Sequence, residues 1–373
     1  MKIETIAVHS GRFVDTATGA VTPPIYLSTT FEREPGGEYP KGYNYTRSNN
    51  PNRESLEKCL AELESGEAAA AFSSGSAVSM SIFQTLSPGD HILACDDIYH
   101  GTRHLIQLFG TWGITSSFVD MTNLKSFQSE LRKGTKLVWI ETPSNPLLKI
   151  IDLKSISEAA HKAGAVVVCD NTWATPVLQS PFNFGVDLVM HATTKYIGGH
   201  SDILGGAVIA KKNDELFQKI KEMQKSGGAV PSPFECWLTL RGVQTLPLRI
   251  RAQSESAMLI AEFLNSHPKV TKVHYPGLES HPAHLLAMEQ MKLFGGMISF
   301  EIKGGKDEAM KLAANVKLFT RATSLGGPES LIEHRASIEG PESKTPQSLL
   351  RMSIGLEHPD DLIEDLKQAL SSF

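Results

Sequence analysis

The sequence predicts an α/β fold with a mostly parallel sheet covered by helices on both faces, followed by a smaller α+β unit. Between residues 51 and 245, short apolar runs alternate with stretches of helical periodicity. Because these runs are largely apolar at successive positions, we expect strands buried on both sides, as in parallel sheets. The runs are "AAAAFS", "HILACDD", "SSFVDM", "KLVWIET", "AVVVCDN", "VDLVMHA" and "GGAVIA".

The chain of 373 residues is long enough for two domains. Residues 1–50 are rich in Pro, Gly and Tyr and show little periodicity, so we expect an extended arm. Residues 51–245 form the large domain, which begins with a helix over "NRESLEKCLAELES" that Gly66 ends. Residues 246–373 form the C-terminal domain, and we expect a long helix over 247–266 to tie the two together.

Composition argues against several classes of partner. The net charge is −5 and no basic stripe is interleaved with aromatic residues, so we expect no nucleic-acid partner. No apolar run approaches the roughly 20 residues of a membrane span, and the N-terminus lacks the apolar segment of a signal peptide. The 4 cysteines form no CxxC pair, which favours a reducing cytoplasm. His281 and His284 have no third ligand nearby, so we expect no metal site.

Polar residues follow several predicted strands, at the edge where ligands bind in open α/β sheets. Asp170 ends "VVVCD", and its carboxylate is costly to bury without a cationic partner, although it could simply cap the next turn. Lys195 follows "VDLVMHA" on the next strand. Tyr99 follows "HILACDD", either to cover a flat ring or as a surface residue, and Asn145 follows "KLVWIET".

The segment "SSGSAV" places small residues, Ser73 to Ser76, at the start of a helix. Backbone N–H groups at such a start favour a phosphate, although a turn with a serine N-cap would look the same. Neither GxxxxGK[ST] nor GxGxxG occurs, so a nucleotide site is not predicted. A phosphate cradle, an aromatic ring, an acid and a lysine at one sheet edge together fit pyridoxal 5'-phosphate (PLP).

Many motifs of the chain occur in the order found in one family of PLP enzymes. They include "YNYTRSNNPNRESLE", "SSGSAV", "ETPSNP", "CDNTWATP", "TTKYIGGHSD", "SLGGPESLIEH" and "LLRMSIGLE". The chain resembles the cysteine/methionine-metabolism enzymes, such as cystathionine γ-synthases and γ-lyases, over nearly its whole length. The resemblance implies the aspartate-aminotransferase-like fold (fold type I), with a mixed sheet, and a homotetramer built from two tight dimers.

The resemblance also implies roles for individual residues in holding the cofactor. Lys195 would bind PLP covalently and carry protons, Asp170 would pair with the ring nitrogen, and Tyr99 would stack on the ring and assist proton transfer. Other residues would contact the phosphate and the ring hydroxyl of PLP or lie next to Asp170. Gly75, Ser76 and Thr194 would bind the phosphate, Asn145 would lie near the ring hydroxyl, and Thr172 would lie beside Asp170.

Two further regions receive roles from the resemblance. Arg351 would bind the α-carboxylate of an amino-acid substrate with its bidentate guanidinium, and Ser324 would line the same pocket. Tyr45 and Arg47, in "YTR", would reach into the neighbouring subunit and complete its phosphate site. The active site would therefore be shared across a dimer.

The chain departs from the family at positions that help select the far end of the substrate. An acid is replaced by Asn44, an arginine by His104, and a glutamate by Thr323, while Gly101 replaces the cysteine of methionine γ-lyases. We therefore expect fewer formal charges in the distal pocket. Ala192 replaces a phosphate-binding serine, so we expect the phosphate to lose one hydroxyl contact unless Thr193 or a water supplies it.

The leading hypothesis is γ-replacement or γ-elimination on homoserine-derived sulfur amino acids, with cystathionine γ-synthase or γ-lyase preferred. Alternatives are methionine γ-lyase, cystathionine β-lyase and O-acylhomoserine sulfhydrylase. A fold-type-I transaminase would also use lysine, aspartate and arginine, but "YTR" with "SLGG" argues against it. A non-catalytic protein would have no reason to keep all these groups.

Overall fold

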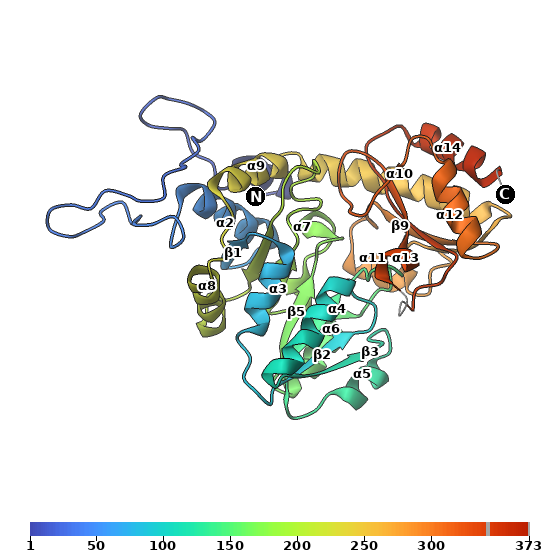
Figure 1. Ribbon diagram of the computed structural model, residues 1–373, viewed down its shortest axis with the longest axis horizontal. Helices are drawn as coiled ribbons and strands as arrows, with labels where there is room; N and C mark the ends of the chain where they lie inside the picture. The colour runs from blue at the N-terminus through green and yellow to red at the C-terminus, as the bar shows by residue number, and fades with distance from the viewer. Residues whose placement is uncertain (341–343, 372–373) are drawn as a thin grey trace.

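The computed structural model describes residues 1–340 and 344–371, and it contains two sheets arranged along its long axis (Figure 1). Each of the seven apolar runs forms a strand of the larger sheet. These strands are β1 (Ala68–Phe72), β2 (His91–Cys95), β3 (Thr115–Val119), β4 (Thr135–Glu141), β5 (Val166–Asp170), β6 (Leu188–His191) and β7 (Gly206–Ala210).

The larger sheet is mixed, with the strand order β1-β7-β6-β5-β4-β2-β3. Strand β7 runs antiparallel to both of its neighbours, and the other pairs are parallel. Strands β1, β2, β4, β5 and β6 therefore point the same way. Their carboxyl ends lie along one edge of the sheet, where the loops after them can meet.

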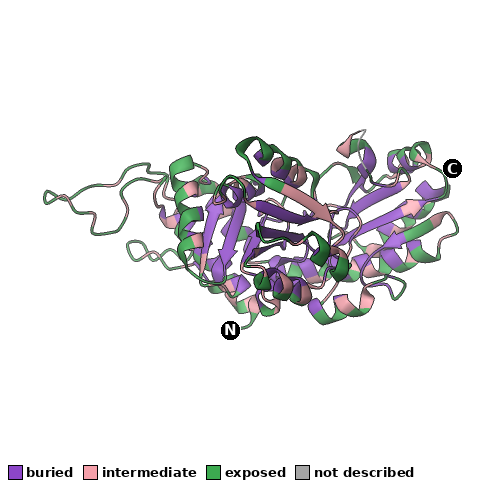
Figure 2. Ribbon diagram, turned by 90° about the horizontal axis from the view of Figure 1, so that it is seen from below, coloured by how far each residue is buried: buried purple, intermediate pink, exposed green. Residues whose placement is uncertain are grey.

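Apart from the edge strand β3, the strands of this sheet form a largely buried layer between helices, as Figure 2 shows. At its centre Trp139 is fully buried, and its ring centroid lies 5.2 Å from that of Phe83. The α-helices of this region are α2 (Pro51–Glu64), α3 (Gly75–Phe83), α4 (His100–Leu108), α5 (Leu124–Glu130), α6 (Leu153–Lys162), α7 (Thr175–Leu178), α8 (Glu215–Gly227) and α9 (Pro233–Val243). The 3₁₀ helices are η1 (Phe109–Trp112) and η2 (Pro181–Phe184).

The smaller sheet has the strand order β10-β11-β12-β9-β8. Its strands are β8 (Val270–His274), β9 (Met297–Ile302), β10 (Thr320–Arg321), β11 (Leu331–His334) and β12 (Leu349–Ser353). The long helix α10 (Leu246–Ser266) packs on β8 and β9 and also touches α1 and α7, so it links the two parts of the molecule. The other helices here are α11 (His284–Gln290), α12 (Lys306–Asn315), α13 (Arg335–Glu339) and α14 (Pro359–Ser371).

The N-terminal segment differs in part from an extended arm. Residues Ile3–His9 form helix α1, whose Ala7 is buried and which packs against α2 and α10. Beyond it the chain projects from the body in two long loops (Figure 1), and an isolated bridge pairs Thr30 with Tyr45. The helix went unpredicted because seven residues are too few to show a clear period.

Two local features also differ from the expectation. Helix α2 ends at Glu64, and the C-cap residue Ser65 takes the left-handed conformation with φ 62°, a place expected for Gly66. A Cβ at Gly66 would lie 2.4 Å from a methyl carbon of Ile209, so this glycine is needed for close packing. Helix α9 was not predicted, although Ser232 and Glu235 form a capping box at its start. In the described part of the chain, no helix combines the length and apolar character that crossing a bilayer requires.

Candidate active site

A cavity of about 440 Å³ lies at the carboxyl ends of the parallel strands, beside loops of the smaller sheet. It collects residues that are far apart in the sequence, because β1, β2, β4, β5 and β6 all end at this edge. Most of the site residues expected from the sequence line it. These are Gly75, Ser76, Tyr99, Asn145, Asp170, Thr172, Thr194, Lys195, Thr323, Ser324 and Arg351.

Lys195 lies in a turn after β6 with its amine inside the cavity. Its Nζ donates a hydrogen bond to Oγ of Ser324 at 3.0 Å. Burial, and next the nearby guanidinium of Arg351, lower the pKa of Lys195 to about 8. A substantial fraction of this amine is therefore neutral near physiological pH, as a nucleophile or general base requires.

Asp170 stands at the end of β5, and only 7% of its surface is exposed. Its Oδ1 accepts the backbone N–H of Thr172 at 3.0 Å, and burial raises its pKa above the usual range. Among the described residues no lysine or arginine forms an ion pair with it. A buried carboxylate without a cation favours a ligand that brings one.

Glu141 is a second carboxyl group on the cavity wall, and the sequence analysis did not single it out. It ends β4 opposite Asp170 on β5, and burial together with the charge of Asp170 raises its pKa well above the usual range. Its Oε2 accepts the backbone N–H of Tyr99 at 2.8 Å. Glu141 therefore fixes the start of α4 and the position of the tyrosine ring. Its place at the end of "KLVWIE" was the available signal.

The start of α3, where the sequence predicts a phosphate site, forms part of the cavity wall. Ser74 caps the helix by accepting the N–H of Ala77 at 3.1 Å, and the first turn leaves other N–H groups for a ligand. Gly206 on β7 permits this arrangement, because a Cβ there would lie 2.4 Å from the carbonyl oxygen of Ser74. The loop between β1 and α3 can therefore rest directly on the neighbouring strand.

Ala192 and Thr194 line the cavity as well, whereas Thr193 is buried outside the cavity lining. Thr194 Oγ1 donates to the carbonyl oxygen of Gly205 at 3.1 Å and accepts its N–H at 3.0 Å. The geometry thus gives no sign that Thr193 replaces the serine missing at position 192. Ser79, one turn into α3, also lines the cavity.

Arg351 on β12 is held from two sides. Its Nη2 lies 2.5 Å from Oε1 of Glu333, its partner across the antiparallel pair of β11 and β12, and its Nη1 donates to Oδ1 of Asn145 at 2.9 Å. Asn145 therefore contacts the arginine in the structure, whereas the resemblance placed it near the ring hydroxyl. These contacts fix the guanidinium at the cavity wall, where it could bind a carboxylate.

Arg335 adds a second arginine to the cavity, and the sequence analysis missed it. Its Nη1 lies 3.1 Å from Oε1 of Glu333, and its Nε lies 2.9 Å from Oε1 of Glu339. The expectation of fewer formal charges came from Asn44, His104 and Thr323, and it did not take Arg335 into account. The signal was present, since "EHRAS" puts an arginine directly after a strand that ends beside the site.

Four expected site residues do not line the cavity of their own chain: Asn44, Tyr45, Arg47 and His104. His104 is exposed on α4. Tyr45 is 44% exposed in the arm, and Arg47 donates to the carbonyl oxygen of Lys225 at 3.2 Å. The expected role of the arm residues belongs to a neighbouring subunit, so it stays a prediction.

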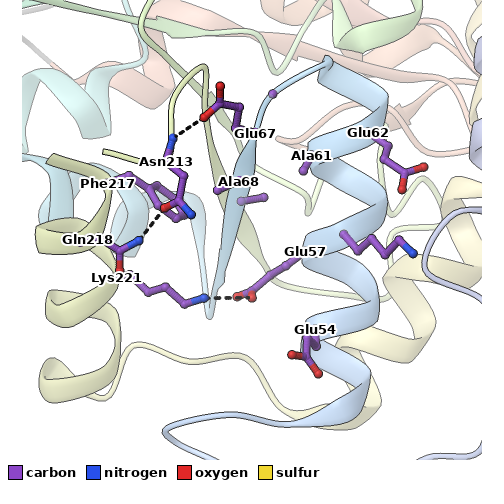
Figure 3. Close-up of a pocket in the computed structure, with 13 residues that line it drawn as sticks. Glu54, Glu57, Ala61, Glu62, Glu67, Ala68, Asn213, Phe217, Gln218 and Lys221 are labelled. Carbon is purple, nitrogen blue, oxygen red and sulfur yellow. Dashed lines mark hydrogen bonds and ion pairs between the residues drawn. The ribbon is translucent and has the colours of Figure 1, made fainter. Parts of the chain in front are cut away.

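A second hollow, of about 360 Å³, lies on the outer side of β1 between α2 and α8 (Figure 3). Some of its polar side chains have partners within it: Lys221 Nζ lies 4.0 Å from Oε2 of Glu57, and the carboxylate of Glu67 accepts the backbone N–H of Asn213 at 3.0 Å. No residue at a carboxyl end of the parallel strands reaches this hollow, so we assign it no ligand.

The cavity at the strand ends fits PLP by its own chemistry. Asp170 lacks a cation, which a protonated ring nitrogen would supply, and Lys195 offers an amine of lowered pKa. The start of α3 offers N–H groups to a phosphate, and Tyr99 offers a ring. The fold and the site thus define a PLP-dependent enzyme of the aspartate-aminotransferase-like fold.

Comparison with known proteins identifies the family. The model of the family "Cys/Met metabolism PLP-dependent enzyme" matches residues 4–371, and the chain belongs to this family. It is 46% identical to a cystathionine γ-synthase of Mycobacterium leprae, over 99% of this chain and 97% of the relative. It is 45% identical to a cystathionine γ-lyase of Dictyostelium discoideum, over 99% and 97%.

Solved structures give the same result. A crystal structure of metB from Corynebacterium glutamicum superimposes with a TM-score of 0.97 at 42% identity, covering 100% of this chain and 98% of that one. Other matches carry different names, among them a cystathionine β-lyase of Coxiella burnetii at 43% identity and a methionine γ-lyase of Micromonospora echinospora at 41%. Overall similarity therefore leaves the particular reaction open.

Proposed function

We propose that this enzyme catalyses γ-replacement or γ-elimination on homoserine-derived sulfur amino acids, as a cystathionine γ-synthase or a cystathionine γ-lyase. Methionine γ-lyase, cystathionine β-lyase and O-acylhomoserine sulfhydrylase activities are the alternatives within the family. The observation that carries the proposal is the convergence of Lys195, Asp170, Arg351 and the start of α3 on one cavity. The cavity binds an amino acid beside a cofactor and supplies one mobile base.

Each side chain has a distinct task in this proposal. When bound, PLP supplies an electron sink for the negative charge that develops on the substrate α carbon. Asp170 would hold the proton on the ring nitrogen, and the N–H groups at the start of α3 would hold the phosphate. Arg351, fixed by Glu333 and Asn145, would bind the α-carboxylate and so orient the α hydrogen toward Lys195.

The γ-chemistry depends on Lys195. A group on Cγ can leave only after protons have been taken from both Cα and Cβ, and one flexible amine can reach both. With its pKa lowered to about 8, Nζ would take the proton from Cα, pass it to the cofactor, and so be free to take the second proton from Cβ. Ser324, at 3.0 Å, would hold the amine between these positions.

The wider organisation is part of the proposal. We place the boundaries at residues 50 and 245, between an arm, a large PLP-binding domain and a C-terminal domain. The arm, with Tyr45 and Arg47, would complete the site of a second copy, in a homotetramer of two dimers. The four cysteines are free and buried, which supports a cytoplasmic location.

Product analysis of the purified holoenzyme tests the proposal. The protein would be supplied with cystathionine, methionine, and O-succinyl- or O-acetylhomoserine plus cysteine. Formation of cystathionine, or release of 2-oxobutanoate, would support γ-chemistry. Release of pyruvate from cystathionine would show β-elimination, and amino exchange with a 2-oxo acid would show a transaminase. A protein that takes up no PLP would contradict every one of these activities.

A further inference from the structure

Arg335 lines the substrate cavity, yet the family motifs give it no task. It is the first residue of α13, its side chain is 3% exposed, and it lines the cavity. Its Nη2 lies 3.1 Å from Nδ1 of His100, the residue that follows the ring-stacking Tyr99. Arg335 thus stands beside the ring position, on the side of the smaller sheet.

We propose that Arg335 binds a carboxylate at the far end of the substrate, on the group attached to Cγ. The inference rests on the proposed function, because it assumes that an amino acid is bound through Arg351. It names the substrate class more narrowly: amino acids with a carboxylate at both ends. An O-succinyl ester and a cystathionine-like thioether share this chemistry, whereas an O-acetyl ester and methionine lack it.

The first argument is the way in which the two arginines are held. Oε1 of Glu333 lies 2.5 Å from Nη2 of Arg351 and 3.1 Å from Nη1 of Arg335. The two guanidinium groups therefore stand within about 6 Å of each other and both face one cavity. One α-carboxylate needs only one of them, so the second is available for another anion.

The second argument is the number of N–H groups. A guanidinium has five, and Arg335 directs one to Glu333, one to Glu339 and one to His100. Within the described residues this leaves two N–H groups, one on each terminal nitrogen, that can donate to the two oxygens of a carboxylate. Burial lowers the pKa of His100, so its neutral Nδ1 can accept a hydrogen bond from Arg335.

The third argument is the apolar surface of the cavity next to Arg335. Ile338 follows three residues later on α13, and it lines the same cavity. It offers an apolar surface to the methylene groups of a leaving group, while Arg335 offers the charge at their end. An acyl or thioether chain with a terminal carboxylate matches both features, and a short neutral chain matches only the first.

The test compares matched substrates on the holoenzyme. The quantity is the ratio of kcat/KM for O-succinylhomoserine to that for O-acetylhomoserine, and the same ratio for cystathionine and methionine. In Arg335→Gln we expect the ratio to fall about 30-fold or more for the pair that the enzyme uses, because a charged hydrogen-bonded contact is lost. Arg335→Lys, which keeps the charge without the fork, should fall in between.

A binding measurement makes the test independent of turnover. L-2-aminosuberate and L-2-aminooctanoate differ in a terminal carboxylate and have no leaving group on Cγ. Their affinities follow from the absorption change of the bound cofactor. We expect the wild type to prefer the dicarboxylate and Arg335→Gln to lose that preference. Arg321→Gln, which removes an exposed arginine on β10, is the matched control and should keep it.

A purely structural role would give a different pattern. If Arg335 only supports Glu333 and Arg351, both members of each pair lose kcat/KM equally, the ratio stays within about 3-fold, and the proposal is overturned. If Arg335→Gln folds poorly, the double variant Arg335→Gln/Glu339→Gln removes a paired charge as well and is judged by the same ratio. Absence of product from all substrates, with the binding preference intact, would contradict the proposed function instead.

Discussion

The Nζ of Lys195 lies 3.0 Å from the Oγ of Ser324, across the junction between the two sheets. Ser324 has a φ of 116°, an unusual value for a residue other than glycine. The carbonyl oxygen of the same residue lies 3.5 Å from Nη2 of Arg351. One strained residue thus contacts both Lys195 and Arg351, which makes its conformation a requirement of this arrangement.

Two substitutions of Ser324 should distinguish the contribution of its hydroxyl group from that of its strained backbone. Ser324→Ala removes the contact with Lys195 and keeps the strain, so we expect kcat to fall about 5- to 10-fold at unchanged cofactor content. Ser324→Gly also removes the hydroxyl but relieves the strain, so it should have a higher Tm than Ser324→Ala. Steady-state kinetics and thermal unfolding of both variants measure this. Equal Tm values would contradict the strain argument.

The reactivity of Lys195 should follow its lowered pKa. Only the neutral amine attacks a carbonyl, and protonation dominates below the pKa of about 8. The association rate of PLP with the cofactor-free protein should therefore rise from pH 7 and level off above about pH 8 to 9. An unperturbed lysine would still gain reactivity up to its ordinary pKa of 10.5. Stopped-flow absorbance measures the rate, with Lys195→Met as the control.

Replacement of Asp170 should have opposite effects on activity and on stability. Asp170→Asn cannot hold a proton on the ring nitrogen, so kcat should fall about 100-fold or more. Burial raises the pKa of Asp170 in the folded state, so the folded protein binds more protons than the unfolded chain between the two pKa values. Stability from this group is therefore lost as pH rises through that window. At pH 7 the cofactor-free Asp170→Asn variant should be more stable than the wild type in urea.

Removal of Glu333 should destabilise the fold, because its one carboxylate pairs with two buried arginines. We expect Glu333→Gln to lower the free energy of unfolding by about 3 kcal/mol. Glu364 forms an exposed pair with Lys367 at 3.4 Å, so Glu364→Gln should change it by less than about 0.5 kcal/mol. Denaturant titration compares the two, and a small effect of Glu333→Gln would show that the arginines find other partners.

A serine in place of Ala192, as the family resemblance implies for this position, should strengthen cofactor binding. Ala192 lines the cavity close to the start of α3, since a Cβ added to Gly75 would lie 3.0 Å from the Ala192 methyl group, so a hydroxyl added at position 192 could reach the phosphate of PLP. Ala192→Ser should lower the Kd of PLP about 3- to 10-fold. Fluorescence titration of the cofactor-free protein measures the change. Weaker binding would indicate a clash at the start of α3.

The large sheet was predictable because each of its strands is encoded by a short apolar run of consecutive residues. Each apolar run formed a strand, and Asp170 and Lys195 meet because parallel strands end at the same edge. Helix α1 and the left-handed conformation of Ser65 after α2 were not predicted. In both cases the decisive interactions are packing contacts, with α10 in the first case and around Gly66 in the second.

By itself the sequence determined the fold class, the lysine and acid of the site, and hence the cofactor. Only the tertiary structure decided which charges surround the substrate. Glu333 meets Arg351 through the pairing of β11 with β12, and Arg335 enters the cavity because α13 begins where β11 ends. The physical reason is that strand-end positions follow from a short apolar pattern, whereas the electrostatics of a pocket arise from side chains that only the packed chain brings together.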